Sequence, residues 1–210
     1  MSFKKNKYTI VRKTITKDLA IFLSNYFSIK KQVYNTCRNF KYISQFETML
    51  GFYEGPHGQV PNTYCSYADI AMETLMLKCQ PIMEKKTELK LYPAYTYARI
   101  YKTGDELKRH KDRFSCEIST TMNLGGDNWP IYLKPSGKEG MKGIKVDLKP
   151  GDMLVYSGCE LEHWREPFKG QECVQVFLHY NNVKTKNSKE NMFDKKPHIG
   201  LPEYFKKNDI

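Results

Sequence analysis

Hydrophobic residues recur every three or four positions in two stretches of the first 90 residues, the spacing of one face of an α-helix. Thr16 or Asp18 can cap the first helix, whose apolar positions are Leu19, Ile21, Phe22, Leu23, Tyr26 and Phe27. The second runs from about Tyr67 to Glu88, and its main apolar residues are Ile70, Leu75, Met76 and Cys79. Within it, Pro81 either kinks the helix or opens a further one. Residues 51–63 between the two are rich in glycine and proline, which predicts a loop with His57 exposed.

The hydrophobic pattern changes at about residue 91. Six short runs rich in β-branched and aromatic residues follow, separated by Gly, Pro, Asn or Asp: LYPAYTYARIY, CEISTTMNL, WPIYLKP, GIKVDL, DMLVY and CVQVFLHY. Strands at this spacing, with no helical pattern between them, predict a barrel or a double-sheet jelly roll. We therefore expect an α+β chain in which the N-terminal helices pack outside an all-β core.

These patterns divide the chain into three parts of one domain, because 210 residues are few for two domains. Residues 1–90 form the N-terminal helical part and residues 91–182 form the β core. Residues 183–210 are polar, lysine-rich and nearly free of pattern. We expect them to form a basic C-terminal extension that is ordered in part at best.

The formal net charge of +11 raises the question of an acidic partner such as a nucleic acid. The lysines crowd the two ends of the chain, and solvated ends explain the charge equally well, so the sequence allows a nucleic-acid partner without favouring it. No apolar run approaches the roughly 18 residues of a membrane span, and the first residues do not resemble a secretory signal. These features predict a cytosolic protein with no membrane partner.

Six cysteines occur, and no two of them form the C-x-x-C pair of zinc knuckles and redox motifs. Cys79, Cys116 and Cys173 lie in apolar runs, where cysteine behaves as a small hydrophobic residue. We expect free thiols, most of them buried.

His110 and Asp112 lie between two predicted strands, in the sequence RHKDRFSC. In extended backbone, residues i and i+2 point to the same side, so this pair presents an imidazole and a carboxylate together. A second histidine would complete the facial triad of non-haem Fe(II) oxygenases, and His163 is the candidate. It lies in GCELEHWREPF, also between two predicted strands and 51 residues beyond Asp112, which leaves room for the strands of a jelly roll.

Two segments carry a resemblance to a known family. YKTGDELKRHKD resembles the Y-x-x-G-x-x-L-x-x-H-x-D signature of Fe(II)- and 2-oxoglutarate-dependent dioxygenases, and LKPGDMLVYSGCELEHWREP resembles their Pro-Gly-Asp turn, strand and distal histidine. The match covers roughly residues 91–182 and is most similar to the prolyl 4-hydroxylase-like branch, in its compact microbial or viral type. The resemblance implies a double-stranded β-helix, or cupin-like jelly roll, with Fe(II) bound by His110, Asp112 and His163.

The resemblance also implies an activity: hydroxylation of a protein side chain, above all peptidyl proline, with O₂ and 2-oxoglutarate consumed and succinate and CO₂ as coproducts. Two alternatives stay open, a nucleic-acid demethylase of the same superfamily and a non-catalytic metal-binding β-helix module. Trp129, Tyr132 and Trp164 are candidates for the wall of the pocket, although aromatic residues on strands are more often plain core. His179 ends the last predicted strand without a companion and is expected to be structural.

The sequence departs from the family at the residue that binds the distal carboxylate of 2-oxoglutarate. The resemblance places a Lys or Arg about ten residues after the distal histidine, where this chain has Cys173. Arg165 shares a face with His163, and Arg99 shares one with Tyr101, the residue that matches a tyrosine donating to 2-oxoglutarate in relatives. We expect Arg165 to be the anchor, assisted by Tyr101, with Arg99 as its rival. Arg113 and Lys169 are outer alternatives.

Overall fold

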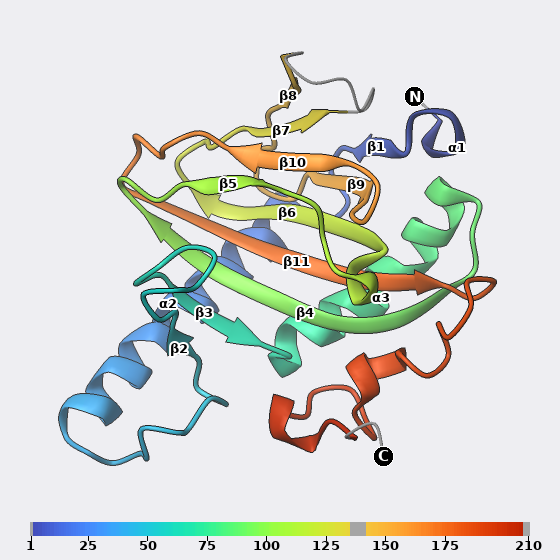
Figure 1. Ribbon diagram of the computed structural model, residues 1–210. Helices are drawn as coiled ribbons and strands as arrows, with labels where there is room; N and C mark the ends of the chain where they lie inside the picture. The colour runs from blue at the N-terminus through green and yellow to red at the C-terminus, as the bar shows by residue number, and fades with distance from the viewer. Residues whose placement is uncertain (1, 135–141, 208–210) are drawn as a thin grey trace.

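The computed structural model describes residues 2–134 and 142–207, and the strands of these residues lie in two antiparallel sheets (Figure 1). The larger sheet has the order β1-β9-β6-β11-β4-β3-β2 and the smaller the order β5-β10-β7-β8. The strands are β1 (Tyr8–Val11), β2 (Phe52–Tyr53), β3 (Tyr64–Tyr67), β4 (Leu91–Lys102), β5 (Leu107–His110), β6 (Ile118–Gly126), β7 (Ile131–Lys134), β8 (Ile144–Val146), β9 (Met153–Ser157), β10 (Glu162–Arg165) and β11 (Glu172–Asn182).

The strands from β4 to β11 pass back and forth between the two sheets, with β4, β6, β9 and β11 in the larger and the other four in the smaller. Two facing sheets between which the chain alternates in this way form a double-stranded β-helix. The predicted α+β class and jelly-roll core are confirmed.

Both faces of the larger sheet are buried. On β11 the even positions, Val174, Val176, Leu178 and Tyr180, belong to the hydrophobic core shared with the helices. The odd positions point to the opposite face, into the space between the sheets, because neighbouring residues of a strand alternate. This double burial explains why the central strands appear in the sequence as apolar runs with few charges.

The helices are α1 (Phe3–Asn6), α2 (Lys17–Asn39), α3 (Ile70–Thr87) and the 3₁₀ segments η1 (Phe114–Cys116), η2 (Met192–Lys195) and η3 (Glu203–Phe205). Thr16 caps α2 by accepting a hydrogen bond from the Leu19 amide, one of the two caps that the sequence suggests. Asp69 caps α3, which runs through Pro81 as one helix. In the described residues no helix combines the length and the hydropathy that a membrane span needs.

The N-terminal part contributes strands as well as helices. β1 pairs with β9, and β3 pairs with β4, so residues 1–90 extend the larger sheet at both edges. The sequence pattern does not reveal these strands, because segments of two to four residues are too short to show an alternation. The first 90 residues are therefore more closely joined to the core than the sequence alone suggests.

The C-terminal extension packs on the core through buried charges. The Asp194 carboxylate accepts hydrogen bonds from the Tyr67 hydroxyl at 2.6 Å and pairs with Lys206 at 2.9 Å and Arg113 at 3.4 Å. Lys196 is also buried and donates to the Tyr67 hydroxyl at 3.0 Å. Most of these contacts are polar, which explains why the segment shows no apolar pattern. The described residues 183–207 thus make contacts with the core that the sequence pattern does not reveal.

We expect Asp194→Asn to lower the free energy of unfolding by about 1–3 kcal/mol, because the buried Asp194 carboxylate loses its charge-assisted hydrogen bonds with Tyr67 and Lys206. Urea unfolding measures this change. Glu203→Gln is the matched control: Glu203 also pairs with Lys206, at 2.7 Å, but its side chain is 67% exposed. An exposed pair contributes only about 0–1 kcal/mol. Equal effects of the two substitutions would contradict the buried role of Asp194.

The same variant has an expected pH dependence. Burial alone would raise the pKa of the Asp194 carboxyl, but hydrogen bonds from Tyr67 and Lys206 lower it below its usual value. The group therefore stabilises the fold above the pKa of an unfolded aspartate, about 3.9, and this contribution is lost as the pH falls toward the lower pKa of the folded state. Wild type should lose more stability than Asp194→Asn between about pH 6 and pH 3.

Candidate metal centre and cosubstrate pocket

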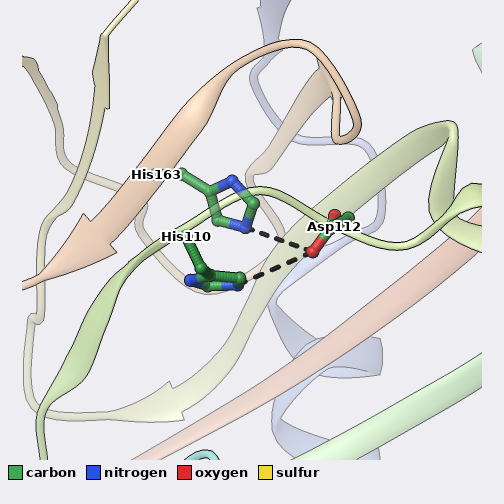
Figure 2. A group of neighbouring side chains, drawn as sticks. All are labelled: His110, Asp112 and His163. Atoms are coloured by element: carbon green, nitrogen blue, oxygen red, sulfur yellow. Dashed lines mark ion pairs between the residues drawn. The ribbon is translucent and has the colours of Figure 1, made fainter.

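Three side chains meet at one point, two from the paired strands β5 and β10 and one from the loop that follows β5 (Figure 2). His110 ends β5, His163 lies in β10, and the two residues are paired in the sheet. The Asp112 Oδ1 atom lies 3.6 Å from His110 Nε2 and 3.4 Å from His163 Nε2. The structure therefore brings together the three residues that the sequence motif selects.

The geometry of the three atoms fits a divalent first-row metal. Ligand atoms at about 2.0–2.1 Å from an octahedral ion lie about 3 Å apart on one face, close to the separations found here. The His110 Nδ1 atom is 2.8 Å from the Lys108 carbonyl oxygen, and the His163 Nδ1 atom is 3.0 Å from that of Leu161. An Nδ1–H that donates to a carbonyl leaves the Nε2 lone pair free for a metal.

Asp112 is held in place by contacts to its second oxygen. The Ser119 hydroxyl donates to Asp112 Oδ2 at 2.9 Å, and the position of Gly158 leaves no room for a side chain beside the same oxygen. Burial opposes ionisation of Asp112, but the neighbouring His110 and His163 imidazoles favour the ionised carboxylate and keep its pKa well below the usual range. Oδ1 is thus an ionised oxygen that faces both imidazoles.

His179 lies behind this carboxylate. Its Nδ1 atom is 2.9 Å from the Ser119 hydroxyl oxygen, and since that hydroxyl donates its proton to Asp112, the imidazole donates to Ser119. Burial lowers the pKa of His179 to about 4, so the ring is neutral near pH 7. His179, Cys116 and Asp112 also have potential ligand atoms within 4.8 Å of one another. The sequence does not connect Ser119 or His179 with the triad, because Asp112, Ser119 and His179 come from a loop and from the two strands β6 and β11.

A cavity of about 350 Å³ opens beside the triad. Alternate residues of β4 line it, namely Tyr95, Tyr97, Arg99 and Tyr101, as expected for one face of a strand. Phe177 and His179 line it from β11, and Glu54 and Gln59 from the loop before β3. The Gln59 side-chain amide nitrogen is 2.9 Å from His110 Nε2. A metal ion bound by His110 would replace this amide as the partner of Nε2.

The tryptophans expected to wall this cavity lie elsewhere, so that prediction is wrong. Trp164 and Tyr132 are paired across β10 and β7 and stack at 5.5 Å, with the Arg109 guanidinium 3.8 Å above the Trp164 ring. They occupy the strand face opposite that of His163, because neighbouring residues alternate. Trp129 packs behind Tyr101, with ring centroids 4.7 Å apart.

Arg165 is 1% exposed and lies inside the barrel. Its Nη1 atom donates to the Trp129 carbonyl oxygen and its Nη2 atom to the Thr121 hydroxyl at 3.1 Å, while Nε has no hydrogen-bond partner in the described part of the chain. No carboxylate of the described residues lies within ion-pair distance of it. Burial lowers the pKa of this guanidinium, which indicates a cation that lacks an anionic neighbour.

Arg99 differs from Arg165 in having an acidic partner. Its Nη2 atom lies 2.5 Å from Glu54 Oε1, and the Arg99 side chain is 4% exposed. Of the other two alternatives, Lys169 is exposed, and Arg113 lines the cavity but is half-exposed and pairs with Asp194. Among these four cations, Arg165 is the buried one without a carboxylate.

Tyr101 and Cys173 lie close to Arg165. The two residues are paired across β4 and β11, and Arg165 contributes to the electrostatic surroundings of both side chains. The Tyr101 hydroxyl makes no hydrogen bond to any described residue, although the side chain is only 1% exposed, and burial raises its pKa. The guanidinium of Arg165 therefore lies close to Cys173, the position at which the resemblance places a Lys or Arg.

The structure is similar to several solved structures. The prolyl-4-hydroxylase of Pseudomonas putida has a TM-score of 0.61 at 14% identity, covering 86% of this chain and 95% of that chain. The viral collagen prolyl hydroxylase of Paramecium bursaria Chlorella virus-1, in complex with 2-oxoglutarate, has a TM-score of 0.56 at 13% identity, covering 86% and 98%. The α-ketoglutarate-dependent epimerase SnoN of nogalamycin biosynthesis has a TM-score of 0.64 at 10% identity, covering 86% and 78%.

The sequence itself matches no protein-family model and no curated protein. The reactions named for the structural neighbours differ, since a hydroxylase and an epimerase share this architecture. The likeness therefore concerns the fold and leaves the substrate open. The chain has the double-stranded β-helix fold of the Fe(II)- and 2-oxoglutarate-dependent oxygenases, as its sequence motifs predict.

Proposed function

We propose that this protein is an Fe(II)- and 2-oxoglutarate-dependent dioxygenase that hydroxylates a protein side chain, most readily peptidyl proline. The observation that carries the proposal is the pairing of two sites in one barrel. His110, Asp112 and His163 converge on one point, and Arg165 is buried nearby without a carboxylate. The two imidazoles and the carboxylate suit a metal ion, and the Arg165 guanidinium suits an anion.

In this proposal His110, Asp112 and His163 hold Fe(II) on one face, which leaves positions for 2-oxoglutarate and O₂. Bound together, these groups supply the oxidising chemistry, with succinate and CO₂ as coproducts. Arg165 and the Tyr101 hydroxyl bind the distal carboxylate of 2-oxoglutarate. The side chains that surround them exclude water, because Tyr101, Tyr156 and Arg165 are each at most 2% exposed.

The charges that face the cavity favour an uncharged reacting group. Glu54 neutralises Arg99, Arg113 pairs with Asp194, and Lys111 and Asp112 carry one charge each of opposite sign. The two positive charges of Fe(II) would be offset by the two negative charges of 2-oxoglutarate. A proline ring adds no charge, and the rings of Tyr95, Tyr97 and Phe177 offer it apolar contact surface.

The structural neighbours include two prolyl hydroxylases, which supports this substrate class. The experiment is to incubate purified protein with Fe(II) and 2-oxoglutarate, together with a proline-rich peptide or with methylated single-stranded DNA and RNA. We expect succinate formation to rise with the peptide, and the peptide to gain the mass of one oxygen atom. Formaldehyde release from the nucleic acid instead would replace the hydroxylase by a demethylase, and no succinate in any mixture would indicate a non-catalytic module.

We also propose a cytosolic location. None of the six cysteines is in a disulfide, and Cys65, Cys79, Cys116 and Cys173 are buried. Free thiols are typical of a reducing compartment. The location of a fluorescent fusion protein inside expressing cells tests this proposal. Secretion of the fusion protein would contradict a cytosolic location.

A further inference from the structure

Helix α2 carries two apolar stripes, of which one has no partner in the described chain. The first stripe includes Leu23 and Phe27 and packs in the core. The second contains three side chains of the helix with large exposed fractions, Phe22 at 67%, Ile29 at 59% and Val33 at 43%, and continues to the C-cap residue Phe40 at 66%. Large apolar side chains that are exposed together along one side of a helix indicate an interaction site.

The second stripe has the spacing of a coiled-coil seam. Successive positions are four, three, four, three and four residues apart, which is the alternation of a and d positions in a heptad repeat: Phe22, Tyr26, Ile29, Val33, Thr36 and Phe40. These positions span about 27 Å of helix axis at 1.5 Å per residue. The spacing is that of a surface that receives another helix.

We propose that this seam pairs with the same seam of a second copy of the chain. The two helices are antiparallel, and the two-fold axis that relates them passes at the level of Lys31 along the helix. The seam is symmetric about that residue. Phe22 then faces Phe40 of the second copy, Tyr26 faces Thr36, and Ile29 faces Val33. Aromatic rings meet aromatic rings at the ends and β-branched side chains meet in the centre, as an isologous interface requires.

The charges beside the seam permit self-association, although the chain as a whole carries +11. One flank consists of Asn25, Gln32 and Asn39, which are uncharged amides able to donate and accept hydrogen bonds. On the other flank the Lys30 ammonium is 2.5 Å from the Asp69 carboxylate of its own chain. The repulsion expected from the net charge therefore does not act at the contact itself.

A groove beside the seam enlarges the apolar surface. Tyr26, Ile29 and Val33 line a cavity of about 430 Å³ together with Met49 and Ile70, which are 52% and 65% exposed. In Figure 1 the second half of α2 projects from the body of the protein together with the chain that follows it. A second helix can thus approach the seam from outside.

The oligomeric state tests the proposal. Light scattering coupled to gel filtration of the full chain should give the mass of two copies at about 100 µM, where a dimer of micromolar affinity is mostly associated. Ile29→Glu with Val33→Glu should give the mass of one copy, because it places two charges in the seam. Ile21→Glu is the matched control, since Ile21 is 39% exposed on the same helix but one position outside the seam, and this variant should remain a dimer.

Cross-linking tests the antiparallel register. In a chain with Cys37→Ser and Cys159→Ser, a short bismaleimide should join two copies through Gln32→Cys, which lies near the axis. Asn25→Cys should not react in this way, because the two copies of residue 25 lie about 18 Å apart along the helices. A monomeric wild type, a dimer that survives the double glutamate variant, or equal cross-linking at both positions would overturn the proposal.

Discussion

His163→Ala is expected to abolish turnover of 2-oxoglutarate to succinate, and this is one of the two largest effects predicted for the protein. The side chain is 2% exposed and directs Nε2 at the Asp112 carboxylate, 3.4 Å away. Three protein ligands are the set that holds a catalytic Fe(II) while leaving positions for cosubstrates. Removal of one should also weaken metal binding, which calorimetry with Mn(II) measures without any turnover.

Two further variants make this test decisive. His110→Ala should have the same consequence, and because the His110 side chain is 25% exposed, its loss disturbs the core less than that of His163. His57→Ala is the control, since His57 is exposed on the loop before β3 and should be replaced without effect. A folded His163→Ala protein with wild-type turnover would show that the triad is not the metal site.

Much of the barrel could be predicted from the sequence because its long strands are buried on both faces. β4 and β11 have 12 and 11 residues, and their β-branched and aromatic composition distinguishes them from helices. β5 and β10 have four residues each, with charged or aromatic side chains, so the pattern could not mark them as strands. These two short strands nevertheless carry His110 and His163.

The triad could be found in advance because its members follow a motif in the chain. Ser119, Glu54 and Gln59 follow no such motif, since each acts on a residue that is distant in the sequence, as Glu54 does on Arg99. The same holds for Asp194, whose partner Tyr67 is 127 residues away. Contacts of this kind depend on the relative placement of strands and loops, which hydrophobic periodicity does not specify.

Arg165→Met is expected to raise the Michaelis constant for 2-oxoglutarate by about 10- to 100-fold, which corresponds to roughly 1.5–3 kcal/mol for a hydrogen bond to a charged group. Methionine keeps much of the volume and removes the charge, so the core remains filled. Metal binding should be unchanged, because Arg165 contacts Trp129 and Thr121 and none of the three triad residues. Direct titration of 2-oxoglutarate into the metal-loaded protein without O₂ should show the same loss of affinity.

The rival anchor is Arg99, and its surroundings decide against it. Glu54 already lies 2.5 Å from the Arg99 guanidinium, so a carboxylate of 2-oxoglutarate would have to displace an existing ion pair. Arg165 gains an ion pair without losing one, since its present acceptors are uncharged. Arg99→Met should therefore leave the Michaelis constant for 2-oxoglutarate within about threefold of wild type. A large rise in Arg99→Met together with an unchanged constant in Arg165→Met would move the anchor to β4, because the two arginines lie on different strands and each variant removes only one of them.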